Sequence, residues 1–434
     1  MNPIRIGCLF LLLFSLHPLA AQEVESVEFR LDNGLEVTLH RFPEATGQAV
    51  YILLPHGLLF DDAHRAQFAH LMEHMLIRSH DGDGPRDDEL LINGETGALG
   101  MRLEALGPLE SWRKGLETVA RWMTPGAFDE KTLQREKEKI AMEMETTISS
   151  GFVHKWADAA WNQVVRHGLP RARVRGDVRE STAAAIRDHL HAHFGGIRGA
   201  RLLCTGPRPL DEKKKAILKL FGTLPATQPP ARPMLDAERV RRPIDLKGAW
   251  DLPGRHLIQW YWLPRDAEDT APLAAVLGPL LNRALLMDPE LKATGARTLV
   301  NAQARCPEGR LVMISSALPE KIDLTAFKKR CAERIAAAIP DAASLGLLQS
   351  QAARELTRWP PFAAMKSQMA SSPFAAYVEA QLALNRERIL LSTGLRPAAL
   401  SLALQRPSPG ALSATLKRIL TPDRRGTLLL EPLP

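Results

Sequence analysis

Residues 61–78 read DDAHRAQFAHLMEHMLIR, and this stretch combines a helix pattern with a closely spaced set of polar side chains. Its apolar residues recur at the three-and-four spacing of one helical face, at Phe68, Leu71, Met75 and Leu76. Asp61 and Asp62 precede them, and the helix dipole favours acidic residues in a first turn. The stretch therefore predicts an amphipathic helix that opens at the two aspartates.

The same stretch contains the motif H-x-x-E-H, from His70 to His74. On a helix the two histidines lie one turn apart, so both imidazoles point to one side and can bind one metal ion. Glu73 lies beside His70 and can reach water in the open coordination position of that metal. A catalytic zinc ion takes three protein ligands and one open position, so the motif predicts a third ligand elsewhere in the chain.

The long charged helix predicted over residues 129–147 offers candidates for this ligand. Its buried stripe is marked by spacings of seven and four, at Leu133, Ile140 and Met144. Glu136 and Glu143 are seven residues apart and lie about 60° from that stripe, at roughly 100° per residue. We therefore expect Glu143 to be the third ligand and Glu136 to orient a ligand or hold substrate.

The elements around these helices alternate between strand and helix patterns. Asn33-Gly34 separates two β-rich runs and predicts a hairpin. Further strands are predicted over residues 50–54, 99–106 and 201–204, and further helices over residues 109–122, 181–194 and 213–220. After the Pro-rich stretch the plan recurs, with strands over residues 256–263, 298–305, 311–317 and 426–430 and helices over residues 271–286 and 324–339. This order predicts α+β or α/β sandwich halves that arose by duplication and face each other.

The composition fits a globular protein of two domains. The chain has 434 residues, 45% hydrophobic and 24% charged, with a net charge of +7 spread along its length and no sustained basic block. This distribution argues against nucleic-acid binding. Residues 1–21 have the pattern of a signal peptide cut after Ala20 or Ala21, which predicts a periplasmic or secreted protein with no membrane span in the mature chain. The predicted parts are an N-terminal zinc-binding domain over residues 22–221, a linker over residues 222–243 and a metal-free domain over residues 244–434.

The remaining cysteines and histidines give weaker signals. Export permits a disulfide, and either Cys306 pairs with Cys331 or all three cysteines that follow the leader, with Cys204, are buried thiols. Three further histidines fit no ligand spacing with the motif and are predicted to be loop or surface residues: His56, His64 and His80.

Taken together, these motifs resemble the insulinase/pitrilysin family of zinc peptidases, and most of all its short members related to mitochondrial processing peptidase. The family joins H-x-x-E-H to a downstream E-x6-E helix, here Glu136 to Glu143. The likeness includes the Asn33-Gly34 hairpin and Met75-Leu76, and it continues more weakly into the second half. The resemblance implies a clamshell of two α/β/α sandwich halves around a chamber, with one zinc ion in the first half, and a partner or second copy that often closes the chamber.

The resemblance also implies a function. We expect an exported zinc metalloendopeptidase that cuts extended peptides, with Glu73 as general base. The substrate would pair with an edge strand, for which residues 99–106 are the candidate, with Gly97, Ala98 and Leu99 at its start.

Two departures from the family pattern leave alternatives open. The family's Asn-Ala-x-Thr segment before the edge strand corresponds either to Asn93-Gly94-Glu95-Thr96 or to residues 97–100. The family's substrate-binding Tyr in the second half has no counterpart in residues 290–298. The alternative function is therefore a metal-bearing or scaffold subunit of a two-chain peptidase, inactive alone; the partner would be a second copy or a second family member.

Overall fold

The computed structural model describes most of residues 25–433. Not described are residues 1–24, 44, 46, 62–64, 79–89, 98–99, 125–129, 150–153, 177, 179–180, 194–196, 227–239, 265–269, 307–308, 358–396 and 434. The predicted signal peptide and much of the predicted linker therefore lie outside the described residues.

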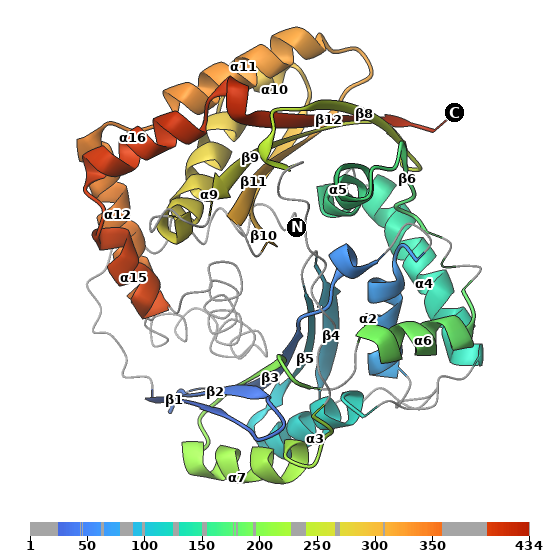
Figure 1. Ribbon diagram of the computed structural model, residues 1–434. Helices are drawn as coiled ribbons and strands as arrows, with labels where there is room; N and C mark the ends of the chain where they lie inside the picture. The colour runs from blue at the N-terminus through green and yellow to red at the C-terminus, as the bar shows by residue number, and fades with distance from the viewer. Residues whose placement is uncertain are drawn as a thin grey trace.

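The chain forms two lobes, each built on a six-stranded sheet (Figure 1). The first sheet has the order β1-β2-β7-β3-β5-β4. Its strands are β1 (Glu25–Arg30), β2 (Glu36–Arg41), β3 (Gly47–Leu54), β4 (Leu91–Thr96), β5 (Met101–Pro108) and β7 (Arg201–Thr205). The predicted hairpin is confirmed, because β1 and β2 pair antiparallel and Gly34 adopts the positive φ of 90° that its turn requires.

The second sheet has the order β10-β11-β9-β12-β8-β6. Its strands are β6 (Arg171–Ala172), β8 (Asp245–Trp250), β9 (Arg255–Pro264), β10 (Arg297–Cys306), β11 (Gly309–Leu318) and β12 (Arg425–Pro432). The short strand β6 comes from the first half of the sequence and pairs parallel with β8. A strand from before residues 222–243 thus belongs to the sheet that follows them. The domain boundary predicted at these residues therefore stays a prediction.

The two sheets share one topology. Reading the second sheet from β8 gives β8-β12-β9-β11-β10, which matches β2-β7-β3-β5-β4 strand for strand. In each of these five-strand runs the first pair is parallel and the following pairs are antiparallel. The predicted duplication is thus visible in the strand order, and the predicted fold class of two similar α+β halves is confirmed.

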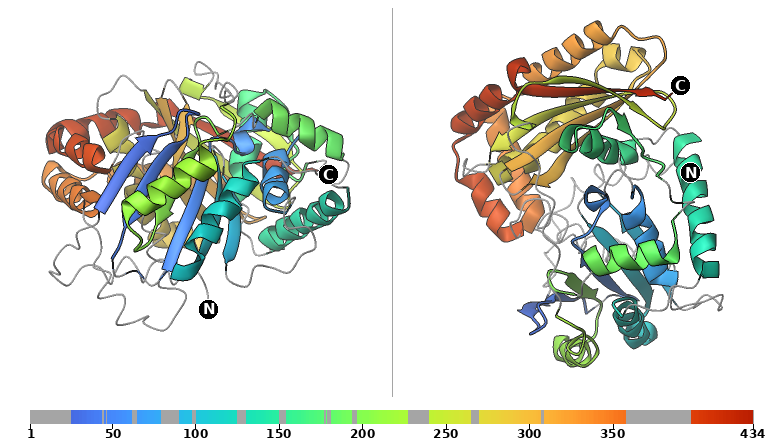
Figure 2. Two further views of the ribbon diagram at one scale, coloured as in Figure 1. Left: turned by 90° about the horizontal axis from the view of Figure 1, so that it is seen from below. Right: turned by 45° about the vertical axis from the view of Figure 1, so that its right-hand side comes forward.

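Helices pack against both sheets. The first half contains α2 (Phe68–Arg78), α3 (Trp112–Trp122), α4 (Glu130–Ser149), α5 (His154–Trp161), α6 (Ala183–His193) and α7 (Leu210–Phe221). The second half contains α9 (Thr270–Leu286), α10 (Pro289–Ala293), α11 (Leu324–Ala337), α12 (Ala342–Thr357), α15 (Pro397–Gln405) and α16 (Pro409–Ile419). Two further views show the two lobes from other sides (Figure 2), and α5 packs on strands of the second sheet although it belongs to the first half. In the described part of the chain, no helix combines the length and apolar character needed to cross a bilayer.

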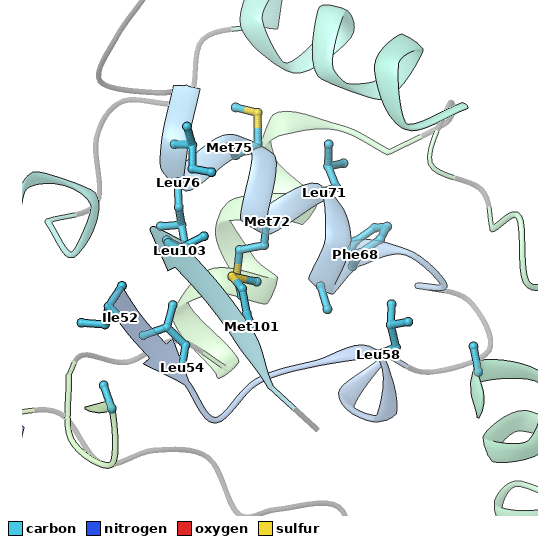
Figure 3. Close-up of a cluster of buried hydrophobic side chains, with 14 of the residues drawn as sticks. Ile52, Leu54, Leu58, Phe68, Leu71, Met72, Met75, Leu76, Met101 and Leu103 are labelled. Carbon is cyan, nitrogen blue, oxygen red and sulfur yellow. The ribbon is translucent and has the colours of Figure 1, made fainter. Parts of the chain in front are cut away.

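An apolar core fixes the rotation of α2. The buried apolar side chains of this helix include Phe68, Leu71, Met72, Met75 and Leu76, and they pack on the strand residues Ile52, Leu54, Met101 and Leu103 (Figure 3). Burial of each such side chain contributes about 1.5–3 kcal/mol. Because this face is committed to the core, the direction of His70 and His74 is set by packing.

The start of α2 differs from the prediction. The described helix begins at Phe68, whereas the sequence pattern placed its start at Asp61. Asp61 instead follows a short 3-10 turn over Leu58–Phe60, and its Oδ1 accepts a hydrogen bond from the backbone N–H of Ala69 at 2.9 Å. Asp61 therefore accepts a hydrogen bond from the N-terminus of α2 although the helix begins several residues later. Residue spacing in the sequence does not reveal such a contact.

The edge of the first sheet also differs from the prediction. The strand that was expected at the edge is β5, which pairs with β3 on one side and β4 on the other. On this side of the sheet the edge strand is β4, which starts at Leu91 and ends at Thr96. Asn93-Gly94-Glu95-Thr96 therefore lies on the edge strand, whereas Gly97 forms the turn that follows it. Ala98 and Leu99 lie outside the described residues.

Cys204 and Cys331 are buried free thiols. Burial raises the pKa of Cys331 to about 11, so this thiol stays protonated at neutral pH. Of the two alternatives, the structure therefore favours buried thiols over a disulfide at Cys331.

We expect Gly426→Ala to destabilise the second lobe. Gly426 on β12 pairs with Trp260 on β9, and an added methyl group would lie 2.1 Å from Trp260 Cε2. Trp260 is fully buried, so its ring cannot move aside, and overpacking of this kind costs about 1–3 kcal/mol. Urea unfolding would measure the loss. Gly410→Ala is the matched control, because an added methyl group there meets nothing within 4 Å; equal stability of the two variants would contradict the prediction.

Candidate metal centre

The two motif histidines and Glu143 converge where α2 packs against α4. Glu143 Oε2 lies 3.5 Å from His70 Nε2, and Glu143 Oε1 lies 3.7 Å from His74 Nε2. The two imidazole rings meet edge to face with centroids 5.0 Å apart. One ligand atom from each residue lies within 4.8 Å of the other two, a separation that one divalent ion can bridge. The structure therefore brings together all three expected ligands.

Hydrogen bonds orient both imidazoles. His74 Nδ1 lies 3.0 Å from Glu136 Oε2, and His70 Nδ1 lies 3.2 Å from Gln67 Oε1. Carboxylate and amide oxygens only accept hydrogen bonds, so each Nδ1 carries a proton, and the neutral form of each ring has its lone pair on Nε2. Both lone pairs then belong to the nitrogens near Glu143. This arrangement of protons fits a metal ligand set.

Gln67 contacts the ligand cluster, a placement that the sequence did not reveal. Its Nε2 donates to the Val174 carbonyl at 2.8 Å, which turns Oε1 toward His70. Gln67 also has a φ of 70°, in the left-handed region that residues other than glycine rarely adopt. Strained backbone of this kind is retained where surrounding contacts hold it, often at functional sites. A glutamine three residues before a histidine carries no distinctive sequence signal.

Glu136 is buried, whereas Glu143 is half exposed. Burial by itself raises the pKa of Glu136, but hydrogen bonds with His74 and Lys139 outweigh it and lower the pKa to about 2. Lys139 Nζ lies 2.7 Å from Glu136 Oε1, and His74 binds the other oxygen. Glu136 is therefore ionised at neutral pH and accepts a hydrogen bond from His74, a contact that fits the first of its two predicted roles.

Glu73 contacts the edge strand. Thr96 Oγ1 donates to Glu73 Oε2 at 2.5 Å, and the Glu73 side chain is buried. Gly94 lies under the carboxylate, where an added methyl group would be 2.3 Å from Glu73 Oε1. The sequence left open which stretch precedes the edge strand and did not reveal a role for Thr96. The contact fixes the carboxylate beside the ligand cluster.

A cavity of about 250 Å³ contains the cluster. It lies between α2, α4 and the edge strand, and its lining is His70, Glu73, His74, Ile77, Arg78, Ile92, Asn93, Gly94, Glu95, Thr96, Glu136, Lys139 and Glu143. Gly97 is not among these lining residues. Gly97 was expected at the start of the substrate-binding strand, but the strand that lines the cavity is β4, which ends before it.

Among the other histidines, His56 lies in a loop, the first of the two placements predicted for it. Its side chain is only 2% exposed, so it is not a surface residue. His64 and His80 lie outside the described residues.

Comparisons with known proteins give structural matches only. No protein-family model matches the chain, and no curated protein sequence matches it. Among solved structures, a protease from Helicobacter pylori matches with a TM-score of 0.67 and 15% identity, over 95% of this chain and 100% of that one. The first half of the periplasmic protease PqqL from Escherichia coli matches with a TM-score of 0.62 and 14% identity, over 95% of this chain and 93% of that one.

Pitrilysin matches with a TM-score of 0.59 and 15% identity, over 96% of this chain but only 46% of its own. At identities this low, a structural match shows a shared fold alone. Because each match covers nearly all of this chain, the shared fold includes both lobes. The chain therefore has the fold of the insulinase/pitrilysin family of peptidases.

Proposed function

We propose that the chain is an exported zinc metalloendopeptidase that hydrolyses extended peptides or small unfolded proteins. The observation that carries the proposal is the convergence of two Nε2 atoms on Glu143, with both Nδ1 atoms next to hydrogen-bond acceptors. Two imidazoles and one carboxylate, with a fourth position left open, form a ligand set used by catalytic zinc. When bound, zinc would polarise the scissile carbonyl and acidify a water molecule.

Glu73 supplies the proton transfers in this proposal. Its carboxylate lies next to His74 in the helix and lines the same cavity, so it can accept the proton of the attacking water. The same carboxylate then passes the proton to the leaving amide nitrogen. Thr96 binds one carboxylate oxygen and leaves the other oxygen to move the proton.

The edge of β4 suggests how substrate binds. This strand ends the first sheet and lines the cavity, so an extended peptide that pairs with it would pass beside Glu73. Backbone pairing recognises extended chains with little regard to side chains, which suits an endopeptidase of broad specificity. Residues Asn93 to Thr96 replace residues 97–99 as the proposed substrate-binding stretch.

Location and partners are part of the proposal. The leader pattern of residues 1–21 supports export to the periplasm or beyond. Pitrilysin is about twice as long as this chain, and the matched part of PqqL is its first half. These lengths support pairing with a second copy or with another chain of the same fold. They also keep the alternative of a metal-bearing subunit that is inactive alone.

A chelator experiment tests the proposal. The mature protein should cleave a quenched unstructured peptide, lose this activity in a chelator and regain it with stoichiometric zinc. Zinc binding without cleavage, alone or with a second chain of the same fold, would favour the subunit alternative. Absence of zinc binding would overturn both.

We expect Glu136→Gln to weaken zinc binding by about 10–100-fold, the usual effect of removing a group that orients a metal ligand. The amide keeps the size of the side chain but replaces an ionised acceptor with a neutral one. Competition with a chromogenic chelator would measure the change. Glu138→Gln is the control, because Glu138 is exposed on the same helix and binds Gln134.

A further inference from the structure

A second cluster of potential metal ligands lies at the N-terminal end of α2. It consists of His56, Asp61 and His189, which are 2%, 5% and 1% exposed. His56 and Asp61 flank the short turn before α2, and His189 lies on α6, which packs beside α2 (Figure 1). The cluster shares no residue with the centre formed by His70, His74 and Glu143.

The distances within this cluster resemble those of the first centre. His56 Nε2 lies 3.2 Å from His189 Nε2, and His189 Nε2 lies 3.8 Å from Asp61 Oδ1. One ligand atom from each residue lies within 4.8 Å of the others, as in the first centre. Two nitrogens about 2.0–2.1 Å from a tetrahedral ion are themselves about 3.3 Å apart, which matches the histidine pair.

The surroundings hold these ligands in position. His189 packs edge to face on Phe68 with centroids 5.4 Å apart, and His56 lies against Phe60 with centroids 4.7 Å apart. Asp61 is already bound to the Ala69 N–H at the start of α2. Burying a carboxylate and two imidazoles among aromatic rings costs free energy unless they are paired or bind a metal. Imidazole nitrogen and carboxylate oxygen are ligands that zinc accepts.

We propose that His56, Asp61 and His189 bind a second divalent transition-metal ion of the zinc class, with a structural role. The second oxygen of Asp61 or a water molecule would complete four ligands. The ion would join the loop before α2 to α6 and so fix the N-terminal end of the helix that carries His70. This site does not depend on the peptidase proposal.

Metal stoichiometry tests the second site without reference to activity. Metal-depleted mature protein would be titrated with Zn²⁺ and dialysed against a weak chelator before metal analysis. We expect two equivalents in the wild type, and one each in His74→Ala, which removes only the first centre, and in His189→Phe, which removes only the second. Phenylalanine keeps a ring of similar size against Phe68, and Asp61→Asn offers a second variant if His189→Phe does not fold. His167→Ala, at an exposed position outside both clusters, should retain two.

A second measurement separates specific binding from weak surface binding. Zn²⁺ added to His74→Ala should raise its melting temperature, since an ion that binds only the folded state stabilises it. Adding Asp61→Asn to that variant should abolish the increase. One equivalent in the wild type with none in His74→Ala would overturn the proposal and leave a metal-free hydrogen-bonded histidine pair. Failure of the first centre alone would instead appear as one equivalent that His189→Phe removes.

Discussion

Glu73→Gln should lower kcat/KM for peptide hydrolysis by about 10²–10⁴-fold, the usual contribution of a positioned general base, while leaving zinc content at the wild-type level. Glutamine has the size of glutamate, and its carbonyl oxygen can accept the hydrogen bond that Thr96 donates. The packing of α2 is therefore preserved. What is lost is the group that accepts a proton.

The measurement needs both readouts on the same preparation. Cleavage of the quenched peptide gives kcat/KM, and metal analysis gives zinc per chain. Glu138→Gln serves as the control for a glutamate-to-glutamine change on an exposed helical face. A Glu73→Gln protein that keeps its zinc and most of its activity would show that another group takes the proton. Loss of zinc would instead assign Glu73 to the ligand set.

The sequence predicted the parts of the fold that depend on local periodicity. Strand and helix patterns placed β2, β3, α4 and β9 within a few residues of their observed bounds. The burial of Leu133, Ile140 and Met144 follows the predicted stripe of α4, which is why Glu136 and Glu143 could be distinguished from their neighbours. These features depend on a helix repeat of 3.6 residues, which a sequence displays directly.

Features that depend on contacts between distant residues could not be predicted in the same way. Asp61 binds the N-terminus of α2 across seven intervening residues, so its acidic pattern gave a false helix start. The edge strand was misassigned because residues 91–96, Leu-Ile-Asn-Gly-Glu-Thr, were not predicted as a strand, and β4 is recognised by its pairing with β5. Gln67 orients His70 only because the Val174 carbonyl holds its amide. The two halves show no close sequence repeat, so their duplication is visible in the matching strand order and not in the residues.

The prediction that Glu143 is the third metal ligand can be tested directly by mutation. Glu143→Gln should weaken zinc binding by more than the 10–100-fold expected for Glu136→Gln. Glu143 would bind the metal directly as a charged ligand, whereas Glu136 only orients His74. Activity should fall with zinc occupancy and recover in part at high zinc concentration. Competition with a chelator and the zinc dependence of kcat/KM would measure both effects.

Stability separates this effect from unfolding. The Glu143 side chain is 52% exposed, so without metal its replacement by glutamine should change the unfolding free energy by no more than about 0.5 kcal/mol. Glu145→Gln is the matched control, since Glu145 is 58% exposed on the same helix and pairs with Arg175. That control should keep both zinc affinity and activity. If Glu143→Gln and Glu145→Gln bind zinc equally well, α4 does not supply the ligand, and the convergence of the two helices has another purpose.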